Sequence, residues 1–287
     1  MLATSIAAAA TEDTTETPAV QPPAVSGPIA PPRREVPGRH LSASLGPLYV
    51  PAHFDPAVTT ATDVVVFFHG AAWCAEQNFY DSGLNAVLLS VSLQDYANVF
   101  RDPEILAQVL RQIAQTLADE GVTTRPLGRL CLASFSGGYA AIREILRHGA
   151  YDRMISDVVL ADSLYAPLLA DGSLATAEIE PFTRLARRAA TAGDVRLIFS
   201  HLYPPEEKHR GNKTTLAAAH LIRETGAARH ETCSVNRCGQ RLLYRADKGG
   251  LHILGYAGMT TQDHFEHFYC LSELLRMTSI PRAPDAP

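Results

Sequence analysis

The 287-residue sequence lacks several features that define large classes of proteins. It has no apolar run near the roughly 20 residues that a helix needs to cross a bilayer, so we expect no integral membrane segment. Its formal net charge is only -5, and it has no basic field of the kind that attracts nucleic acid. The expected partner is instead a small molecule.

Metal-binding motifs are also absent. The eleven histidines include no HExxH motif, which would place two zinc ligands on one face of a helix. His264 and His267 have no third ligand at a recognisable spacing, and Cys233 and Cys238 have no second cysteine or histidine pair to complete a zinc site. We expect no metal and no cofactor, and a metal-dependent hydrolase is the weaker hypothesis.

The five cysteines are an odd number. Cys233 and Cys238 lie in a polar stretch, where a local disulfide is expected if the protein is exported and two unpaired thiols otherwise. The other three cysteines have apolar neighbours, which predicts buried free thiols. These three are Cys74, Cys131 and Cys270.

The first 40 residues are expected to precede the folded domain, which covers residues 41–282. Residues 1–10 (MLATSIAAAA) resemble the end of a secretory signal that lacks its basic beginning, which favours a secreted or periplasmic protein. A disordered tail on a cytoplasmic protein is the alternative. Residues 11–34 are rich in Thr, Pro and Glu and bury too little apolar surface to fold, so they are interpreted as a linker.

Beyond this segment, strand-length apolar runs alternate with stretches of helical period, without an internal repeat. This alternation predicts an α/β fold with a mainly parallel central sheet flanked by helices. The predicted strands cover residues 42–50, 63–68, 85–92, 130–134, 157–161 and 195–200, with a further one within 241–256. The predicted helices cover residues 103–117, 138–148, 175–192, 214–225 and 263–277, and the helix over 175–192 is expected to form a small cap above the sheet.

A candidate nucleophile follows the strand over 130–134. The sequence Ser134-Phe135-Ser136-Gly137-Gly138 places Ser136 in a small-x-Ser-x-small pattern between a strand and a helix, which is typical of a nucleophile elbow. The sharp turn needs small residues two positions before and after the nucleophile. Choosing Ser134 instead would put Leu132 at the first of these positions, so Ser136 is the better candidate.

An oxyanion hole is predicted from a second loop. Directly after the strand over 63–68 come His69 and Gly70, and Gly70 lets the chain turn so that the amide of Ala71 or Ala72 points at a developing alkoxide. The amide of Gly137 would be the other donor. His69 is expected to orient this loop rather than act as a base.

These motifs, together with the alternating pattern over residues 42–280, resemble the α/β-hydrolase superfamily. The resemblance implies a Ser-acid-His triad in that chain order, with the histidine after the last strand. His264, which follows the loop over 258–261 and opens the last helix, is our candidate. His252 falls inside a strand and His267 lies one helical turn further on, so neither is preferred.

Asp162 is our candidate for the acid, because it stands at the carboxyl end of a strand, where the active sites of open α/β sheets gather. A helix N-cap is the structural alternative for this aspartate. The next strand reaches a carboxylate only at Glu206. The preference for Asp162 departs from the commoner superfamily placement.

The expected function is that of a serine hydrolase acting on carboxylic esters through an acyl-enzyme intermediate. A peptidase or amidase of the same fold is the alternative within enzymes, and a non-catalytic binding protein is the alternative from another class. Four residues are expected to shape a pocket for an acyl substrate. These are Gly70, Trp73, Tyr165 and His201.

Overall fold

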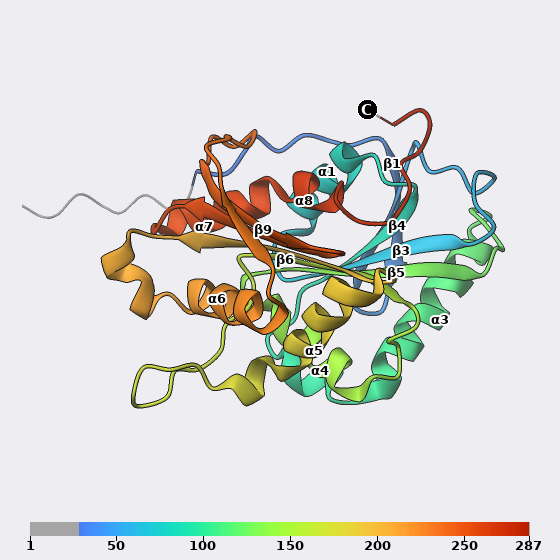
Figure 1. Ribbon diagram of the computed structural model, residues 1–287. Helices are drawn as coiled ribbons and strands as arrows, with labels where there is room; N and C mark the ends of the chain where they lie inside the picture. Colours follow the sequence, from blue (N-terminus) through green and yellow to red (C-terminus); the bar gives the residue numbers. More distant parts are fainter. Residues whose placement is uncertain (1–28, 287) are drawn as a thin grey trace, which may run out of the picture.

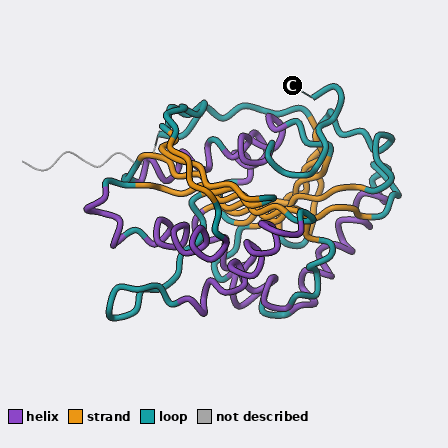
Figure 2. The backbone as a smooth tube through the Cα atoms, in the orientation of Figure 1, coloured by secondary structure: helices purple, strands orange, loops and turns teal. Residues whose placement is uncertain are grey.

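The computed structural model describes residues 29–286, so the signal-like residues 1–10 lie outside the described part. A ten-stranded sheet runs through the centre and has helices on both faces (Figures 1 and 2). The strands are β1 (Gly38–Ala43), β2 (Gly46–Pro51), β3 (Thr62–Phe68), β4 (Ala86–Val91), β5 (Leu127–Phe135), β6 (Ile155–Ala161), β7 (Arg196–Tyr203), β8 (Ala228–Glu231), β9 (Leu242–Lys248) and β10 (Leu251–Ala257). The helices are α1 (Ala72–Ser82), α2 (Tyr96–Phe100), α3 (Pro103–Asp119), α4 (Tyr139–His148), α5 (Thr176–Ala192), α6 (Lys213–Thr225), α7 (Thr261–Tyr269) and α8 (Leu271–Leu275), with 3-10 turns η1 (Ser136–Gly138) and η2 (Glu206–Gly211).

The strand order is β1-β2-β4-β3-β5-β6-β7-β10-β9-β8. All neighbouring strands from β4 to β10 in this order are parallel, and antiparallel hairpins close both edges of the sheet. The parallel strands are mostly apolar because both of their faces are covered, as in β3, where every residue is buried. Their carboxyl ends therefore meet at one edge, where residues from distant parts of the chain come together. The predicted α/β fold with a mainly parallel sheet is confirmed.

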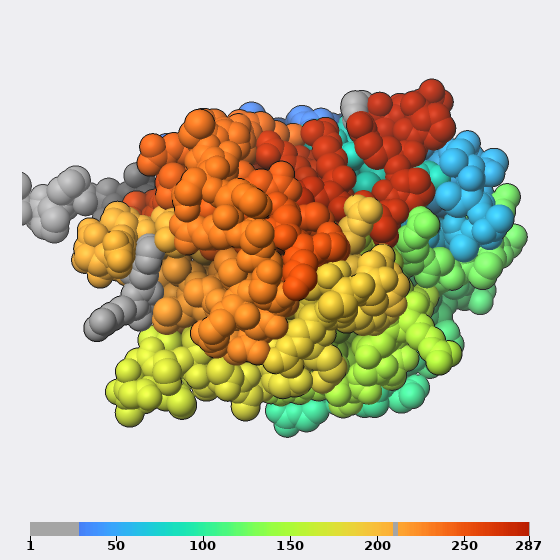
Figure 3. Space-filling model, viewed as in Figure 1, coloured from blue at the N-terminus to red at the C-terminus, as the bar shows by residue number. Residues whose placement is uncertain are grey.

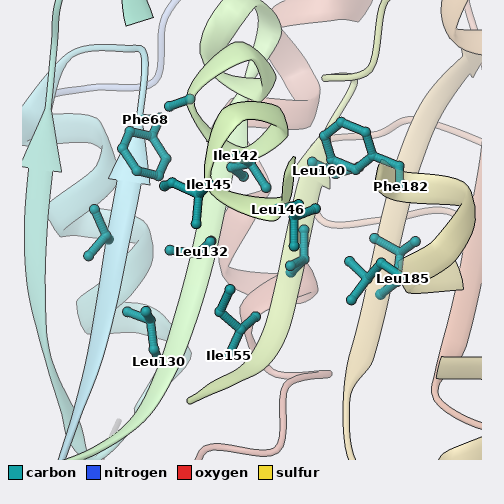
Figure 4. Packing of buried hydrophobic residues seen from close by; sticks show 14 of the residues in the cluster. Phe68, Leu130, Leu132, Ile142, Ile145, Leu146, Ile155, Leu160, Phe182 and Leu185 are labelled. Atoms are coloured by element: carbon teal, nitrogen blue, oxygen red, sulfur yellow. The ribbon is translucent and has the colours of Figure 1, made fainter. Parts of the chain in front are cut away.

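Two hydrophobic cores lie on opposite faces of the sheet. Alternate side chains of β5 enter different cores, since successive residues of a strand point to opposite faces. Leu130 and Leu132 belong to the larger core, whereas Cys131 and Ala133 belong to the smaller one beside α1 and α8. Figure 4 shows Ile142 and other side chains of α4 packed over the strands of the larger core.

Two predicted strands are in fact hairpins, and two helices, α1 and α2, were not predicted. Residues 42–50 contain the turn between β1 and β2, and residues 241–256 contain the turn at Gly249 between β9 and β10. Helix α1 was missed because its buried face mixes Phe79 with the polar side chains of Glu76 and Asn78, which hides the apolar stripe that signals a helix.

The expected cap is not formed by the helix over 175–192. Helix α5 packs against α4, α6 and β7 and contributes Ile179 and Phe182 to the larger core. It is the crossover between the parallel strands β6 and β7, so its apolar face covers the sheet. The segment that projects beside the carboxyl edge is instead the loop between β6 and α5, seen at the lower left of Figures 1 and 3. No helix within residues 29–286 is long and apolar enough to span a membrane.

The disulfide joins Cys238 to Cys270, with a Cα–Cα distance of 6.1 Å. The predicted pairing of Cys233 with Cys238 is therefore wrong, as is the prediction that Cys270 is a free thiol. Cys233 is exposed and free, while Cys74 and Cys131 are buried free thiols, as expected. The turn closed by the hydrogen bond from Asn236 N to Gln240 O carries Cys238 to the end of α7, a contact that sequence spacing does not reveal.

Removing this disulfide is expected to lower stability. The bridged cysteines are 32 residues apart, and a cross-link of this span restricts the unfolded chain by about 3–4 kcal/mol. Cys238→Ser should therefore unfold at a lower urea concentration than the unaltered protein, and Cys233→Ser is the matched control that should not. Peptide mapping without reductant that finds Cys233 bonded to Cys238 would contradict this account.

Candidate active site

Ser136 stands at a sharp turn between β5 and α4. Its backbone has φ 49°, in the left-handed region that a residue other than glycine seldom occupies. A Cβ atom on Gly138 would lie 2.3 Å from the carbonyl oxygen of Phe68, so only glycine fits this position. A Cβ on Gly137 would meet no atom within 4 Å. The turn thus brings the loop after β3 against the serine and leaves space beside Gly137.

A short hydroxyl network holds this turn from below. The buried Ser134 hydroxyl lies 2.8 Å from the Ser163 hydroxyl, which donates to the carbonyl oxygen of Ser136 at 2.7 Å. With Ser163 Oγ donating to that carbonyl, Ser134 Oγ donates to Ser163 Oγ. The small residue at position 134 therefore fills a buried, hydrogen-bonded site below the turn.

Asp162 follows β6 in a left-handed conformation, with φ 40°. Its Oδ2 lies 2.6 Å from His264 Nδ1, and its Oδ1 accepts a hydrogen bond from Leu202 N at 3.1 Å. Burial raises the pKa of this carboxyl. The hydrogen bond from His264, and the positive charge that His267 and His264 carry when protonated, lower it by more than burial raises it, so the net pKa lies below the usual value. Asp162 is therefore an ionised acceptor for the imidazole of His264.

His264 lies in the first turn of α7, which begins with a capping box formed by Thr260 and Asp263. Its ring stacks on Phe135, the residue before Ser136, with 4.5 Å between ring centroids. Tyr165 links two of the three residues: its hydroxyl donates to Asp162 O at 3.0 Å and interacts with the Ser136 side chain. Ser136, Asp162 and His264 thus meet at the carboxyl edge. No direct hydrogen bond joins Ser136 to His264 among residues 29–286, a gap that substrate binding commonly closes.

The loop after β3 lies beside this group. His69 has φ 73° and its amide donates to Val91 O at 3.1 Å, which anchors the loop to β4. Gly70 has φ 131°, and a Cβ there would lie 2.7 Å from the Phe268 ring. Burial, followed by the charge of His264, lowers the pKa of His69. His69 is therefore a neutral side chain at neutral pH, and Ala71, the residue after Gly70, is the N-cap of α1.

Two pockets open at this edge. The first, which we call the catalytic pocket, has a volume of about 450 Å³. Its lining comprises Asp162, Tyr165, Leu202, Asn212, Lys213, Thr214, Met259, Thr260, Thr261 and His264. The second, the outer pocket, has a volume of about 730 Å³. Its lining comprises Tyr203, Pro204, Pro205, Glu206, Arg241, Leu243, Ala257, Gly258, Met259 and Asp263, so the two pockets share Met259.

Of the four predicted pocket residues, one lines a pocket in the structure and three do not. Tyr165 lines the catalytic pocket, whereas Gly70 and Trp73 are outside the lining of both pockets. His201 was wrongly placed in the pocket: it is fully buried, with Nε2 2.6 Å from Tyr244 Oη and Nδ1 2.7 Å from Leu202 O. Strand alternation turns its side chain into the molecule. Sequence reasoning missed Lys213. This residue begins α6, and its position beside the site depends on the path of η2, which precedes α6 in the chain.

The remaining candidates have other surroundings. His267 is buried, with Nδ1 2.8 Å from Ser200 Oγ, rather than solvated. His252 pairs with Asp247 at 2.6 Å across the β9–β10 hairpin. Glu206 lines the outer pocket, while Asp162 is the carboxylate bonded to His264. In the part of the chain that the structure describes, no three His, Cys, Asp or Glu side chains converge as a metal site.

Because two histidines are buried, we expect the protein to lose stability in mild acid. Burial lowers the pKa values of His201 and His267 to about 4, whereas in the unfolded chain a histidine binds its proton below about pH 6.5. Between about pH 4 and about pH 6.5, the unfolded state therefore binds more protons than the folded state. The free energy of unfolding should fall as pH drops from about 6.5 to about 4, by up to ~3 kcal/mol for each histidine.

Urea unfolding at several pH values measures the slope of the free energy of unfolding against pH. His267→Gln should reduce the slope by about one proton, and His148→Gln, at an exposed helix end, is the control that should leave it unchanged. A slope that is the same with and without His267 would show that this histidine does not remain neutral in the folded protein.

The parallel sheet, the strand-turn-helix around Ser136 and the order Ser136, Asp162, His264 at the carboxyl edge define the α/β-hydrolase fold. No family model and no curated protein matches the sequence. Among solved structures, the chain is similar to the enterobactin esterase FES from Shigella flexneri, with 11% identity and a TM-score of 0.47 over 86% of this chain and 60% of that one. It is also similar to carboxyl esterase 2 from Tuber melanosporum, with 13% identity and a TM-score of 0.45 over 88% of each chain.

A third similar structure is the siderophore hydrolase EstB from Aspergillus nidulans. The identity is 12% and the TM-score 0.41, over 92% of this chain and 100% of that one. The chain spans less than two thirds of the Shigella protein. At identities this low, the activity of one protein does not transfer to another, because function depends on the site rather than the fold.

Proposed function

We propose that the protein is a serine hydrolase that cleaves carboxylic esters through an acyl-enzyme intermediate. The observation that carries the proposal is the 2.6 Å contact between Asp162 Oδ2 and His264 Nδ1, beside the turn that holds Ser136. An ionised carboxylate on Nδ1 fixes the tautomer in which Nδ1 carries the proton. Nε2 is then the basic nitrogen of His264.

The reaction follows from these roles. As Ser136 Oγ attacks the ester carbonyl carbon, its proton passes to His264 Nε2, and the carbonyl oxygen becomes an oxyanion. His264 then gives this proton to the leaving alcohol as the carbon–oxygen bond breaks, which leaves the acyl group on Ser136. Water repeats the sequence with His264 as base and releases the acid, while Asp162 stabilises the charged imidazole throughout.

The amides of Ala71 and Gly137 are the proposed donors to the oxyanion. The close approach of Gly138 to Phe68 O supports this, because it holds the turn at Ser136 against the loop that leads to Ala71. The positive φ at Gly70 redirects the chain just before Ala71. The open space at Gly137 leaves room for the oxygen.

We propose that the protein is exported to an oxidising compartment. The disulfide between Cys238 and Cys270 supports a secreted or periplasmic protein, since such bonds are rare where the cell keeps thiols reduced.

Matched esters and amides test the proposed reaction. Short-chain 4-nitrophenyl esters should be hydrolysed with an initial burst of nitrophenol, because acylation of Ser136 releases the phenol before water frees the acid. The corresponding 4-nitroanilides should react far more slowly. Faster turnover of the anilides would favour a peptidase or amidase, and no turnover of either series would contradict the proposal.

A further inference from the structure

The loop between β8 and β9, residues 232–241, lies against α7, the helix that carries the proposed base. It is bonded to α7 at both ends of the helix. At the start, Gln240 Nε2 donates a hydrogen bond to Asp263 O at 2.8 Å. At the other end, Cys238 forms the disulfide with Cys270, the C-cap residue of α7. The loop thus fixes both ends of a helix that is nine residues long.

The side-chain amide of Gln240 is buried, with 4% of its surface exposed, and both of its polar atoms are paired. Its Oε1 accepts a hydrogen bond from Asn236 Nδ2 at 3.2 Å. Its Nε2 faces Asp263 O, because a carbonyl oxygen only accepts hydrogen bonds. Asn236 is itself held, since its Oδ1 accepts from the backbone nitrogens of Cys238 and Gln240 at 3.0 and 2.9 Å. This buried donor therefore has a fixed direction toward α7.

The peptide group between Asp263 and His264 is bonded on both sides. Its oxygen accepts from Gln240, and its nitrogen, His264 N, donates to Thr260 O at 3.1 Å. The imidazole that follows makes the 2.6 Å contact with Asp162. The position of this peptide group sets how the ring lies between the carboxylate and the serine.

We propose that Gln240 is a positioning residue for His264. This inference rests on the proposed esterase function and adds a residue that lies outside the linings of both pockets at the carboxyl edge. Gln240 acts through the backbone of α7, by holding the imidazole where Nε2 can take the proton of Ser136. A displacement of about 1 Å in a catalytic group can slow a reaction by about 10²-fold, so losing this one hydrogen bond should lower kcat by about tenfold.

The effect should appear in kcat rather than in KM. His264 is the proposed base in both acylation and deacylation, so both steps should slow together. Gln240 does not line the catalytic pocket, so substrate binding should be unchanged. A loss of uniform substrate binding would instead raise KM and leave kcat as it was.

Two glutamine variants test the proposal with 4-nitrophenyl butyrate as substrate. Gln240→Met keeps the length of the side chain and removes the donor, and should lower kcat by about tenfold with little change in KM. Gln77→Met is the matched control. Gln77 is also buried and pairs with backbone, accepting from Arg34 N at 3.0 Å and donating to Pro32 O at 3.3 Å, but it lies on α1.

A general loss of stability would lower kcat in both variants alike, and that result would overturn the inference. Gln240→Glu is the second variant, used if Gln240→Met does not fold. Its carboxylate can still accept from Asn236 but cannot donate to Asp263 O when ionised. It should therefore lower kcat at least as much as Gln240→Met.

Proton NMR gives a measurement that does not depend on ester hydrolysis. The proton on His264 Nδ1, held by Asp162, should give a downfield resonance that is absent in His264→Ala. Gln240→Met should shift or broaden this resonance, and Gln77→Met should leave it in place. If no ester is hydrolysed but the resonance changes in Gln240→Met alone, the proposed reaction is wrong and the inference stands. If esters are hydrolysed and Gln240→Met changes neither kcat nor the resonance, the inference is overturned and the proposed reaction stands.

Discussion

Ser136→Ala is expected to reduce the hydrolysis of short acyl esters by about 10³-fold or more, because it removes the atom that bonds to the acyl group. The remaining rate would come from the oxyanion donors and the ordered pocket. The fold should survive, since within residues 29–286 the Ser136 side chain makes only the interaction with Tyr165 described above. Steady-state kinetics and urea unfolding of the same preparation separate lost chemistry from lost structure.

Ser134→Ala is the matched control for this prediction. Ser134 is two residues away, is fully buried and bonds to Ser163 rather than to the pocket. Its loss should cost about 1 kcal/mol of stability and leave turnover within a few-fold of the unaltered protein. If Ser134→Ala is the inactive variant, or if Ser136→Ala keeps its activity, the assignment of the nucleophile is wrong.

Asp162→Asn and His264→Ala are each expected to slow acyl transfer by about 10³- to 10⁴-fold. The amide of asparagine no longer stabilises the protonated imidazole and favours the wrong tautomer, and alanine removes the base itself. Because the three residues act together, Ser136→Ala/His264→Ala should be about as inactive as either single variant.

Variants at the other candidate residues serve as controls. His252→Ala removes the contact with Asp247, which lies on the β9–β10 hairpin, so it should change turnover little. Glu206→Ala alters only the outer pocket and should act through substrate affinity. A large loss of kcat in Glu206→Ala, together with a mild effect of Asp162→Asn, would move the acid to the end of β7.

The regular part of the fold was predictable because the parallel strands are covered on both faces. Runs such as residues 64–68 are continuously apolar, and Pro103 after Asp102 marks the start of α3 from local chemistry alone. The edge hairpins were less predictable. No residue of β1 is fully buried, and β9 alternates between buried and half-buried residues. A two-residue turn such as that between β1 and β2 also interrupts the pattern only briefly.

The candidate site was also predictable only in part. Steric rules placed Ser136, because a turn this sharp restricts its neighbours to small residues, and chain order placed Asp162 and His264 at strand or helix ends. Pocket-lining residues follow no such rule. Lys213 and Met259 reach the catalytic pocket through the paths of the segments that precede them. Cys270 meets Cys238 because α7 ends beside the loop between β8 and β9.

Labelling with a fluorophosphonate followed by peptide mapping tests whether Ser136 is an activated nucleophile, because this reagent reacts with a serine only when a neighbouring base activates it. We expect one labelled peptide, modified at Ser136, with labelling lost in Ser136→Ala, strongly slowed in His264→Ala and retained in Ser134→Ala. Modification of a different serine, or no reaction of the folded protein, would contradict this expectation.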